Sequence, residues 1–301
     1  MTPTTRYSLY VVFSALAAAM SNILTEIALR FIDASPPFLT FTSDLIGALV
    51  LLLPMVLSRE SNHQHWKKSD WLRVIAAALA IYVLSFLLRF ESVNQIGASK
   101  SVLLSQLGTI FVVVLAFIFL GERWTIRHWI AGLLAISGTI LINFDPGELQ
   151  FHMGLGEILA TLAALSVATG IVLIKPLLDR QNGQWTTGLA LLFGAVFLAP
   201  ALPFFGTYNA VWWHAALIIT TMGVIRGLSW STYNVSMQHI GASRSAIIFQ
   251  TTVFFTVTIQ VTIDKLVPDL GLQVPDNLIT AVIGGIIIAL GVIILQKDKN
   301  T

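Results

Sequence analysis

Residues 97–127 read GASKSVLLSQLGTIFVVVLAFIFLGERWTIR, and this stretch decides the fold. Its central part, 102–120, is mostly apolar and about as long as an α-helix must be to cross the roughly 30 Å hydrocarbon core of a bilayer. The beginning of the stretch returns at 241–250 as GASRSAIIFQ, and this second copy opens another apolar segment, 246–263. A spanning helix that occurs twice predicts two related halves within a membrane.

The composition of the chain agrees with a membrane protein. Of its 301 residues, 56% are hydrophobic and 11% are charged, and the mean hydropathy is +0.82, whereas soluble domains carry about 25% charged residues. The net charge of +2 and the lack of a basic block give no reason to expect a nucleic-acid partner. Cysteine is absent, which excludes a disulfide, a thiolate nucleophile and a Cys-based metal site. The amino-terminal MTPTTRYSLY runs directly into an apolar segment, so we interpret that segment as a first spanning helix rather than a signal peptide.

Ten apolar windows predict ten transmembrane helices and an all-α integral membrane protein. With a cytoplasmic N-terminus, twelve of the 17 Lys and Arg residues face the cytoplasm, Arg226 falls mid-span, and four (Arg30, Arg89, Lys100 and Lys265) face outside. Because cytoplasmic loops carry an excess of Lys and Arg, we expect a multi-pass protein of the plasma (inner) membrane with both termini in the cytoplasm. The windows are 7–30, 36–57, 71–90, 98–120, 127–144, 153–175, 185–205, 212–237, 242–264 and 277–296.

Glycines in the fifth and tenth windows extend the internal match. We divide the chain into two repeats of five helices, residues 1–147 and 148–301, and the odd number of crossings inverts the second copy. Inverted repeats recur in secondary transporters, which hold the substrate near the midplane where the repeats meet. The alternative, a chance likeness of apolar helices, is disfavoured because two motifs recur in the same order. The matching triplets in these windows are IAG at 130–132 and GTI at 138–140, then IGG at 283–285 and GVI at 291–293.

Four features of the first half resemble the EamA domain of the drug/metabolite transporter superfamily. They are IGAS at 96–99, LGER at 120–123, Gly132 and Gly138. The second half repeats the pattern, so the resemblance covers essentially the whole chain. It implies a ten-helix carrier in which helices one to four and six to nine surround a central cavity, while five and ten are peripheral. The chain departs from the family pattern at Asp44, where many members carry a basic residue early in helix two. The resemblance implies the activity class and leaves the cargo open, because members carry substrates from amino acids to drugs.

Arg226 is the clearest candidate for substrate binding. An ionisable group within the bilayer is costly, so it needs a partner, a wet cavity or a function. Arg226, Trp230 and Tyr233 follow helical spacing and share one face. A guanidinium beside aromatic rings suits a carboxylate or phosphate attached to an apolar group. The alternative is a structural arginine held by backbone carbonyls or a neighbouring acid.

Two acidic residues also lie at membrane depth. Glu26 follows Asn22 by one helical turn, and we expect Asn22 to contact substrate. A carboxyl group partly removed from water suits proton uptake and release, so Glu26 is our candidate for proton coupling. The alternative for Glu26 is an ion pair with Arg30 or Arg89 that closes the outer end. For Asp44 we favour a structural role.

Further polar residues complete the predicted site. Tyr82 shares a face of the third window with Arg89, and we expect Tyr82 to line the cavity. Arg89 and Glu91 lie at the outer boundary, where we expect a gate salt bridge or snorkelling rather than substrate contact. Gln106 and Gln250 are equivalent residues of the two repeats. Each would either bind the ligand or hold two helices together.

Charges at two helix ends suggest structural roles. Lys100 and Arg244 follow Ser residues that resemble helix N-caps. Because a cation opposes the dipole at a helix N-terminus, we expect both to contact lipid phosphate, with a vestibule for anionic substrate as the alternative. Glu122 is expected to pair with Arg123 or Arg127.

These observations favour a secondary carrier that exports a small amphipathic or zwitterionic, amino-acid-like metabolite by alternating access, with proton coupling through Glu26. A carrier for organic cations such as quaternary amines is the alternative, with Glu26 as counter-charge and Tyr82, Trp230 and Tyr233 as an aromatic cage. An intramembrane enzyme is a distant alternative, because no nucleophile–base set or HExxH motif is present. We expect no catalytic residue, metal or cofactor, and as partners only the small-molecule substrate and the lipid bilayer, in a monomer or homodimer.

Overall fold

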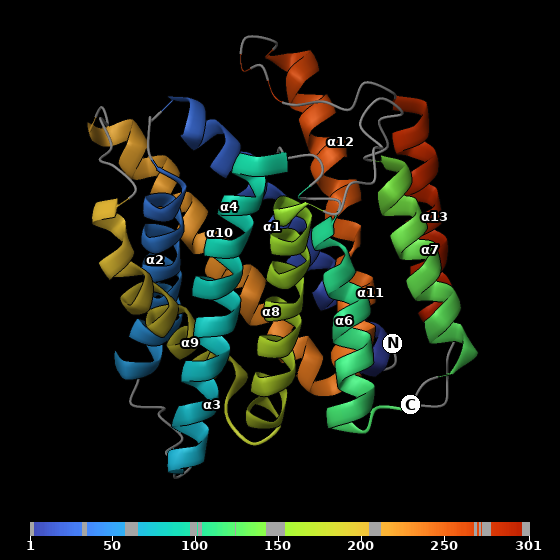
Figure 1. Ribbon diagram of the computed structural model, residues 1–301, viewed down its shortest axis with the longest axis horizontal. Helices are drawn as coiled ribbons and strands as arrows, with labels where there is room; N and C mark the ends of the chain where they lie inside the picture. The colour runs from blue at the N-terminus through green and yellow to red at the C-terminus, as the bar shows by residue number, and fades with distance from the viewer. Residues whose placement is uncertain are drawn as a thin grey trace.

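The computed structural model describes residues 3–31, 35–57, 66–96, 101, 104–123, 125–142, 154–204, 212–267, 270, 272 and 278–296, and all regular structure in these ranges is helical. Helical segments overlap each of the ten apolar windows (Figure 1). Their bounds are α1 (Pro3–Phe31), α2 (Pro36–Leu57), α3 (Lys68–Ala78), η1 (Leu79–Leu84), α4 (Ser85–Ile96), α6 (Leu107–Leu115), η2 (Ala116–Leu120), α7 (Ile126–Ile142), α8 (Leu155–Leu178), α9 (Gly183–Leu198), η3 (Ala199–Phe204), α10 (Trp212–Ile240), α11 (Ala242–Phe249), α12 (Thr251–Leu266) and α13 (Leu278–Gln296).

Six helices in the described ranges are long and apolar enough to cross a membrane. Three more, within α6–η2, α7 and α13, are apolar but shorter. Helix α10 has 29 residues and contains Arg226, Asn234 and several Ser and Thr residues. The prediction of an all-helical membrane protein is therefore confirmed. The six long crossings are 3–29, 36–57, 68–96, 155–178, 183–204 and 242–266.

The third window is one continuous helix with a π-helical turn in its middle. Segments α3, η1 and α4 follow one another without a break from Lys68 to Ile96, and η1 is π-helical. A π-turn leaves a backbone carbonyl unpaired and often occurs at a functional site. Here Ser166 of α8 donates a hydrogen bond to the Ala80 carbonyl at 2.9 Å, and Tyr82 lies in the same turn.

Helices from the two halves of the chain pair with one another. Helix α1 packs on α10, α8 packs on η1 and α4, α2 packs on α9, and α7 packs on α13. In window numbers these pairs are first with eighth, sixth with third, second with seventh, and fifth with tenth. If each window is replaced by the window five places away in the chain, the same four pairs result. The first–eighth pair, for example, becomes the sixth–third pair.

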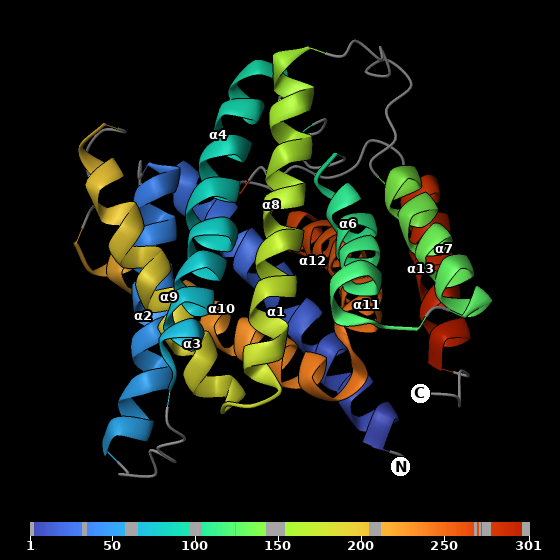
Figure 2. The same ribbon diagram turned by 60° about the horizontal axis from the view of Figure 1, so that its bottom comes forward.

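Helices α7 and α13 form a pair at one edge of the molecule in both views (Figures 1 and 2). Glycine permits their close approach. A Cβ atom on Gly138 would lie 2.5 Å from the Gly284 carbonyl oxygen, and one on Gly291 would lie 2.9 Å from the Ala131 carbonyl oxygen. Gly138 and Gly291, which match one another in the fifth and tenth windows, thus serve packing within the monomer.

Glycine also brings the backbones of α2 and α10 together. A Cβ atom on Gly227 would lie 2.8 Å from Cα of Gly47, and one on Gly223 would lie 2.6 Å from Cβ of Ile46. Small residues spaced by four allow such close helix contacts. The contact brings the first half of the chain against Arg226, the residue before Gly227.

Candidate functional site

Arg226 of α10 forms an ion pair with Asp44 of α2. The guanidinium Nε donates to Oδ1 of Asp44. The Asp44 side chain is 0% exposed and that of Arg226 is 28% exposed. The second oxygen of Asp44, Oδ2, is buried and has no hydrogen-bond partner among the described residues. The pair therefore has an enclosed acidic end and an accessible basic end.

This contact bears on both interpretations of Arg226. If Arg226 is structural, Asp44 is the neighbouring acid that holds it. If Arg226 binds substrate, the accessible part of its guanidinium is the group that a substrate would contact. The two residues are 182 positions apart in the chain, and no periodicity within one helix links them. The Gly223–Gly227 spacing on α10 was the available sequence signal for a close helix partner.

A row of aromatic rings continues from the pair along α10. Tyr82 meets Trp230 edge to face at 5.5 Å between ring centroids, and Trp230 meets Tyr233 at 5.9 Å. Tyr233 in turn meets Phe249 of α11 at 5.1 Å. Tyr82 fits against α9 because residue 194 is a glycine. A Cβ atom on Gly194 would lie 2.6 Å from the Cβ atom of Tyr82. The structure thus brings together three predicted substrate residues and adds Phe249, which the sequence analysis missed.

The two glutamines lie beside the contact between α6 and α11. Gln250, between α11 and α12, donates to Thr109 Oγ1 of α6 at 2.6 Å. Gln106 is half-buried and immediately precedes α6. This hydrogen bond links α6 to the junction of α11 and α12, as expected if Gln250 holds two helices together rather than binding a ligand.

Glu26 and Asn22 lie elsewhere, where α1 faces α12. Glu26 is half-buried, and its Oε2 accepts a hydrogen bond from Nε2 of Gln260 at 2.9 Å. Asn22 is exposed. The side chain of Arg30, one alternative partner of Glu26, lies outside the described residues.

Arg89 and Glu91, the predicted gate residues, are both exposed on α4. Glu91 accepts a hydrogen bond from Gln95 at 2.8 Å. The gate role of Arg89 and Glu91 stays a prediction.

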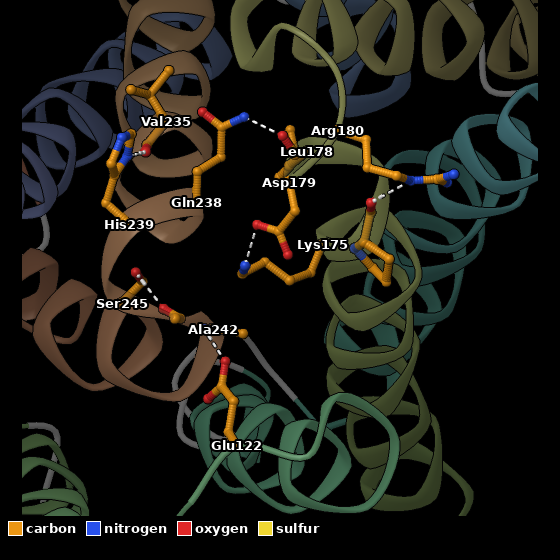
Figure 3. Close-up of polar contacts among 12 residues, drawn as sticks. Glu122, Lys175, Leu178, Asp179, Arg180, Val235, Gln238, His239, Ala242 and Ser245 are labelled. Carbon is orange, nitrogen blue, oxygen red and sulfur yellow. Dashed lines mark hydrogen bonds and ion pairs between the residues drawn. The ribbon is translucent and has the colours of Figure 1, made fainter. Parts of the chain in front are cut away.

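A hollow of about 400 Å³ opens where α8 and α10 end. It is lined by Leu178, Asp179, Arg180, Gln181, Asn182, Gln238 and His239. Figure 3 shows Gln238 reaching from α10 to the carbonyl of Leu178, and Lys175 paired with Asp179. Arg180 donates to Asp70 at 2.8 Å and ties the end of α8 to α3. No predicted substrate residue lines this hollow, and His239 lies about 20 Å from Arg226 along the axis of α10.

Glu122 and Arg244, near the end of α10, differ from the predictions made for them. The carboxylate of Glu122 accepts a hydrogen bond from the backbone N–H of Ala242 (Figure 3) and another from the backbone N–H of Ser243. Glu122 therefore caps α11. The predicted pairing of Glu122 with Arg123 or Arg127 was wrong, because the N-terminus of α11 offers the stronger set of donors. The side chain of Arg244 is only 2% exposed, so its predicted contact with lipid phosphate was wrong as well. Lys100 lies outside the described residues.

Metal binding has no geometric support among the described residues, which contain no cluster of three or more His, Asp and Glu side chains suited to a cation.

The comparison with known families points to transport. The model of the EamA-like transporter family matches residues 5–144 and matches again at residues 154–296. The chain is 25% identical to the "Uncharacterized transporter YvbV" of Bacillus subtilis over 77% of this chain and 75% of that protein. It is 34% identical over 109 residues to the "Probable terminal-alkyne amino-acid exporter" of Streptantibioticus cattleyicolor, which is 36% of either chain.

One solved structure, described only as a crystal structure of a protein, superposes with a TM-score of 0.78 at 16% identity. The match covers 96% of this chain and 97% of the other. At this identity the likeness concerns the fold alone.

Proposed function

Because the chain belongs to the EamA-like transporter family, we propose that it is a secondary carrier that exports a small amphipathic or zwitterionic, amino-acid-like metabolite across the plasma (inner) membrane. The chain is a multi-pass membrane transporter, and the proposal concerns its cargo, its direction and its mechanism. The carrying observation is the 28% exposed Arg226 side chain, one helical turn before the half-buried Trp230, whose ring contacts the buried rings of Tyr82 and Tyr233. A carboxylate would bind the guanidinium, and an apolar group would lie against the rings.

The proposed mechanism is alternating access between two inverted five-helix repeats, 1–147 and 148–301, with ten crossings and both termini in the cytoplasm. The two consecutive family matches support this division. Further support comes from the helix pairing, which is unchanged when each window is exchanged for its counterpart. Helices α7 and α13, which pair at the edge, would remain peripheral while the other helices open and close around the cargo.

The amino-acid class of cargo has support from a relative. The Streptantibioticus protein is named a probable terminal-alkyne amino-acid exporter. Glu26, held by Gln260 between α1 and α12, is the proposed proton-coupling residue. Asn22, Gln106 and Gln250 remain proposed substrate contacts, and Arg89 with Glu91 the proposed outer gate.

A carrier for organic cations is the second candidate. The favouring observation is that Asp44 already balances the charge of Arg226. The half-buried ring of Trp230 would accept a quaternary amine, together with the rings of Tyr82 and Tyr233, which are buried in this structure, once the helices separate.

Radiolabelled leucine and tetraethylammonium, offered separately to proteoliposomes with and without a pH gradient, test these candidates. Saturable leucine flux that the gradient stimulates supports the proposal, and saturable tetraethylammonium flux alone supports the second candidate. A linear, non-saturating flux of both compounds contradicts any carrier mechanism. Arg226→Ala should abolish leucine flux far more than tetraethylammonium flux, and the exposed Arg127→Ala variant on α7 is the matched control for loss of a positive charge.

A further inference from the structure

The geometry points to Asp44 as the second charged contact of the cargo. We infer that Asp44 and Arg226 together select compounds that carry an ammonium and a carboxylate group on the same carbon atom. The cargo carboxylate replaces Asp44 on the Arg226 guanidinium, and the cargo ammonium contacts the carboxylate of Asp44. This inference rests on the proposed function and narrows its substrate class to zwitterions.

The charge balance of the pair carries the argument. Asp44 is fully buried, so it is stabilised only while an opposite charge remains beside it. A cargo with a carboxylate alone would occupy Arg226 and leave Asp44 without a counter-charge. A cargo with an ammonium alone would strand Arg226. A zwitterion supplies a new partner to each residue, and both charges stay compensated.

The hydrogen-bonding capacity of the two residues fits this exchange. A guanidinium carries five N–H donors, and Nε alone is bonded to Asp44. The remaining donors belong to a side chain that is 28% exposed, so a carboxylate can approach before the pair opens. On Asp44, Oδ2 has no partner among the described residues, which leaves an acceptor for an ammonium group once the pair separates.

The location of the pair links recognition to movement. Asp44 lies on α2 of the first half and Arg226 on α10 of the second, where Gly47 and Gly227 bring the two backbones into contact. Separation of the two charges is thus a movement between the two halves. A bound zwitterion would keep both charges compensated during that movement, which a single charge cannot do.

Leucine, leucinamide and N-acetylleucine test the inference, because they share one apolar side chain and carry both charges, only the positive charge and only the negative charge. Each compound competes for counterflow of labelled leucine in proteoliposomes at pH 6.5, where the leucinamide amine is protonated. We expect the wild type to prefer leucine over either analogue by about tenfold. Asp44→Asn should shift the preference toward N-acetylleucine, and Arg226→Gln should shift it toward leucinamide.

The double variant Asp44→Asn/Arg226→Gln keeps the shape of the pair without its charges, and it decides the matter even if a single variant fails to fold. We expect its preferences for the three compounds to differ by less than about threefold. Asp70→Asn is the matched control, because it weakens the Asp70–Arg180 pair between α3 and the end of α8 and should leave the wild-type ranking unchanged.

The outcomes separate the two proposals. If the wild type supports no leucine counterflow, the amino-acid carrier itself is contradicted, and the inference fails with it. If leucine is carried but the double variant keeps the wild-type ranking, the inference alone is overturned and the pair is structural.

Discussion

The carboxylate of Glu122, a residue that follows η2, lies against the first turn of α11. It accepts a hydrogen bond from the backbone N–H of Ala242 at 2.6 Å. A second bond, from the N–H of Ser243, is 3.0 Å long. Glu122 belongs to the LGER turn of the first half, and Ala242 belongs to the GASR segment of the second. A turn that carried the family resemblance and the second copy of the GAS segment are thus in direct contact, through an anion at a helix N-terminus.

Removal of this cap should destabilise the protein. Glu122→Ala leaves two backbone donors of α11 without their acceptor, which should lower the free energy of unfolding by about 1–3 kcal/mol. Intrinsic tryptophan fluorescence during heating in detergent would report this as a lower Tm. The exposed neighbour variant Arg123→Ala should leave Tm nearly unchanged, and equal losses in the two variants would contradict the capping role.

The close contact of α2 and α10 should not tolerate a larger residue. Gly227→Ala places a Cβ atom 2.8 Å from Cα of Gly47, and because both atoms belong to backbone, the helices must separate. We expect a loss of about 1–3 kcal/mol in the free energy of unfolding. Gly132→Ala is the matched control, since its nearest atom is 3.8 Å away. A Tm of the Gly227 variant at or above that of the control would show that the contact is looser than described.

The Gln250–Thr109 hydrogen bond should couple these residues energetically. A double-mutant cycle with Gln250→Ala and Thr109→Val should give a coupling energy of about 0.6–1.7 kcal/mol in thermal stability. If Gln250 instead binds cargo, its replacement should raise the KM for leucine while Thr109→Val leaves KM unchanged. The two readouts, Tm and KM, therefore separate the helix-holding role from the ligand-binding role.

Glu26 should determine the response to a pH gradient. Glu26→Gln removes the titratable group and retains an amide beside Gln260, so gradient-driven accumulation of leucine should fall to the level seen without a gradient. Counterflow, which needs no net proton movement, should continue near the wild-type rate. Asp179→Asn, an exposed carboxylate at the end of α8 outside the proposed site, is the control. Gradient-driven accumulation that survives in Glu26→Gln would assign proton coupling elsewhere.

Much of the helical framework was evident from local sequence. Hydrophobic windows predicted the position of every helical segment in the described ranges, because the cost of burying unpaired backbone groups in lipid forces apolar stretches to become helices. Arg226 was found because a charge within an apolar window is costly. Helical spacing also placed Trp230 and Tyr233 on the same face as Arg226. These are properties of single helices.

Only the tertiary structure decided which residues meet across helices. Periodicity shows which side chains share a face, but it does not identify the opposing helix. The sequence therefore favoured Arg123 or Arg127 for Glu122 and lipid for Arg244, whereas the folded chain gives Glu122 the N-terminus of α11 and buries Arg244. Asp44 reaches Arg226 because Gly47 and Gly227 let two backbones touch, and that closeness depends on the packing of distant segments.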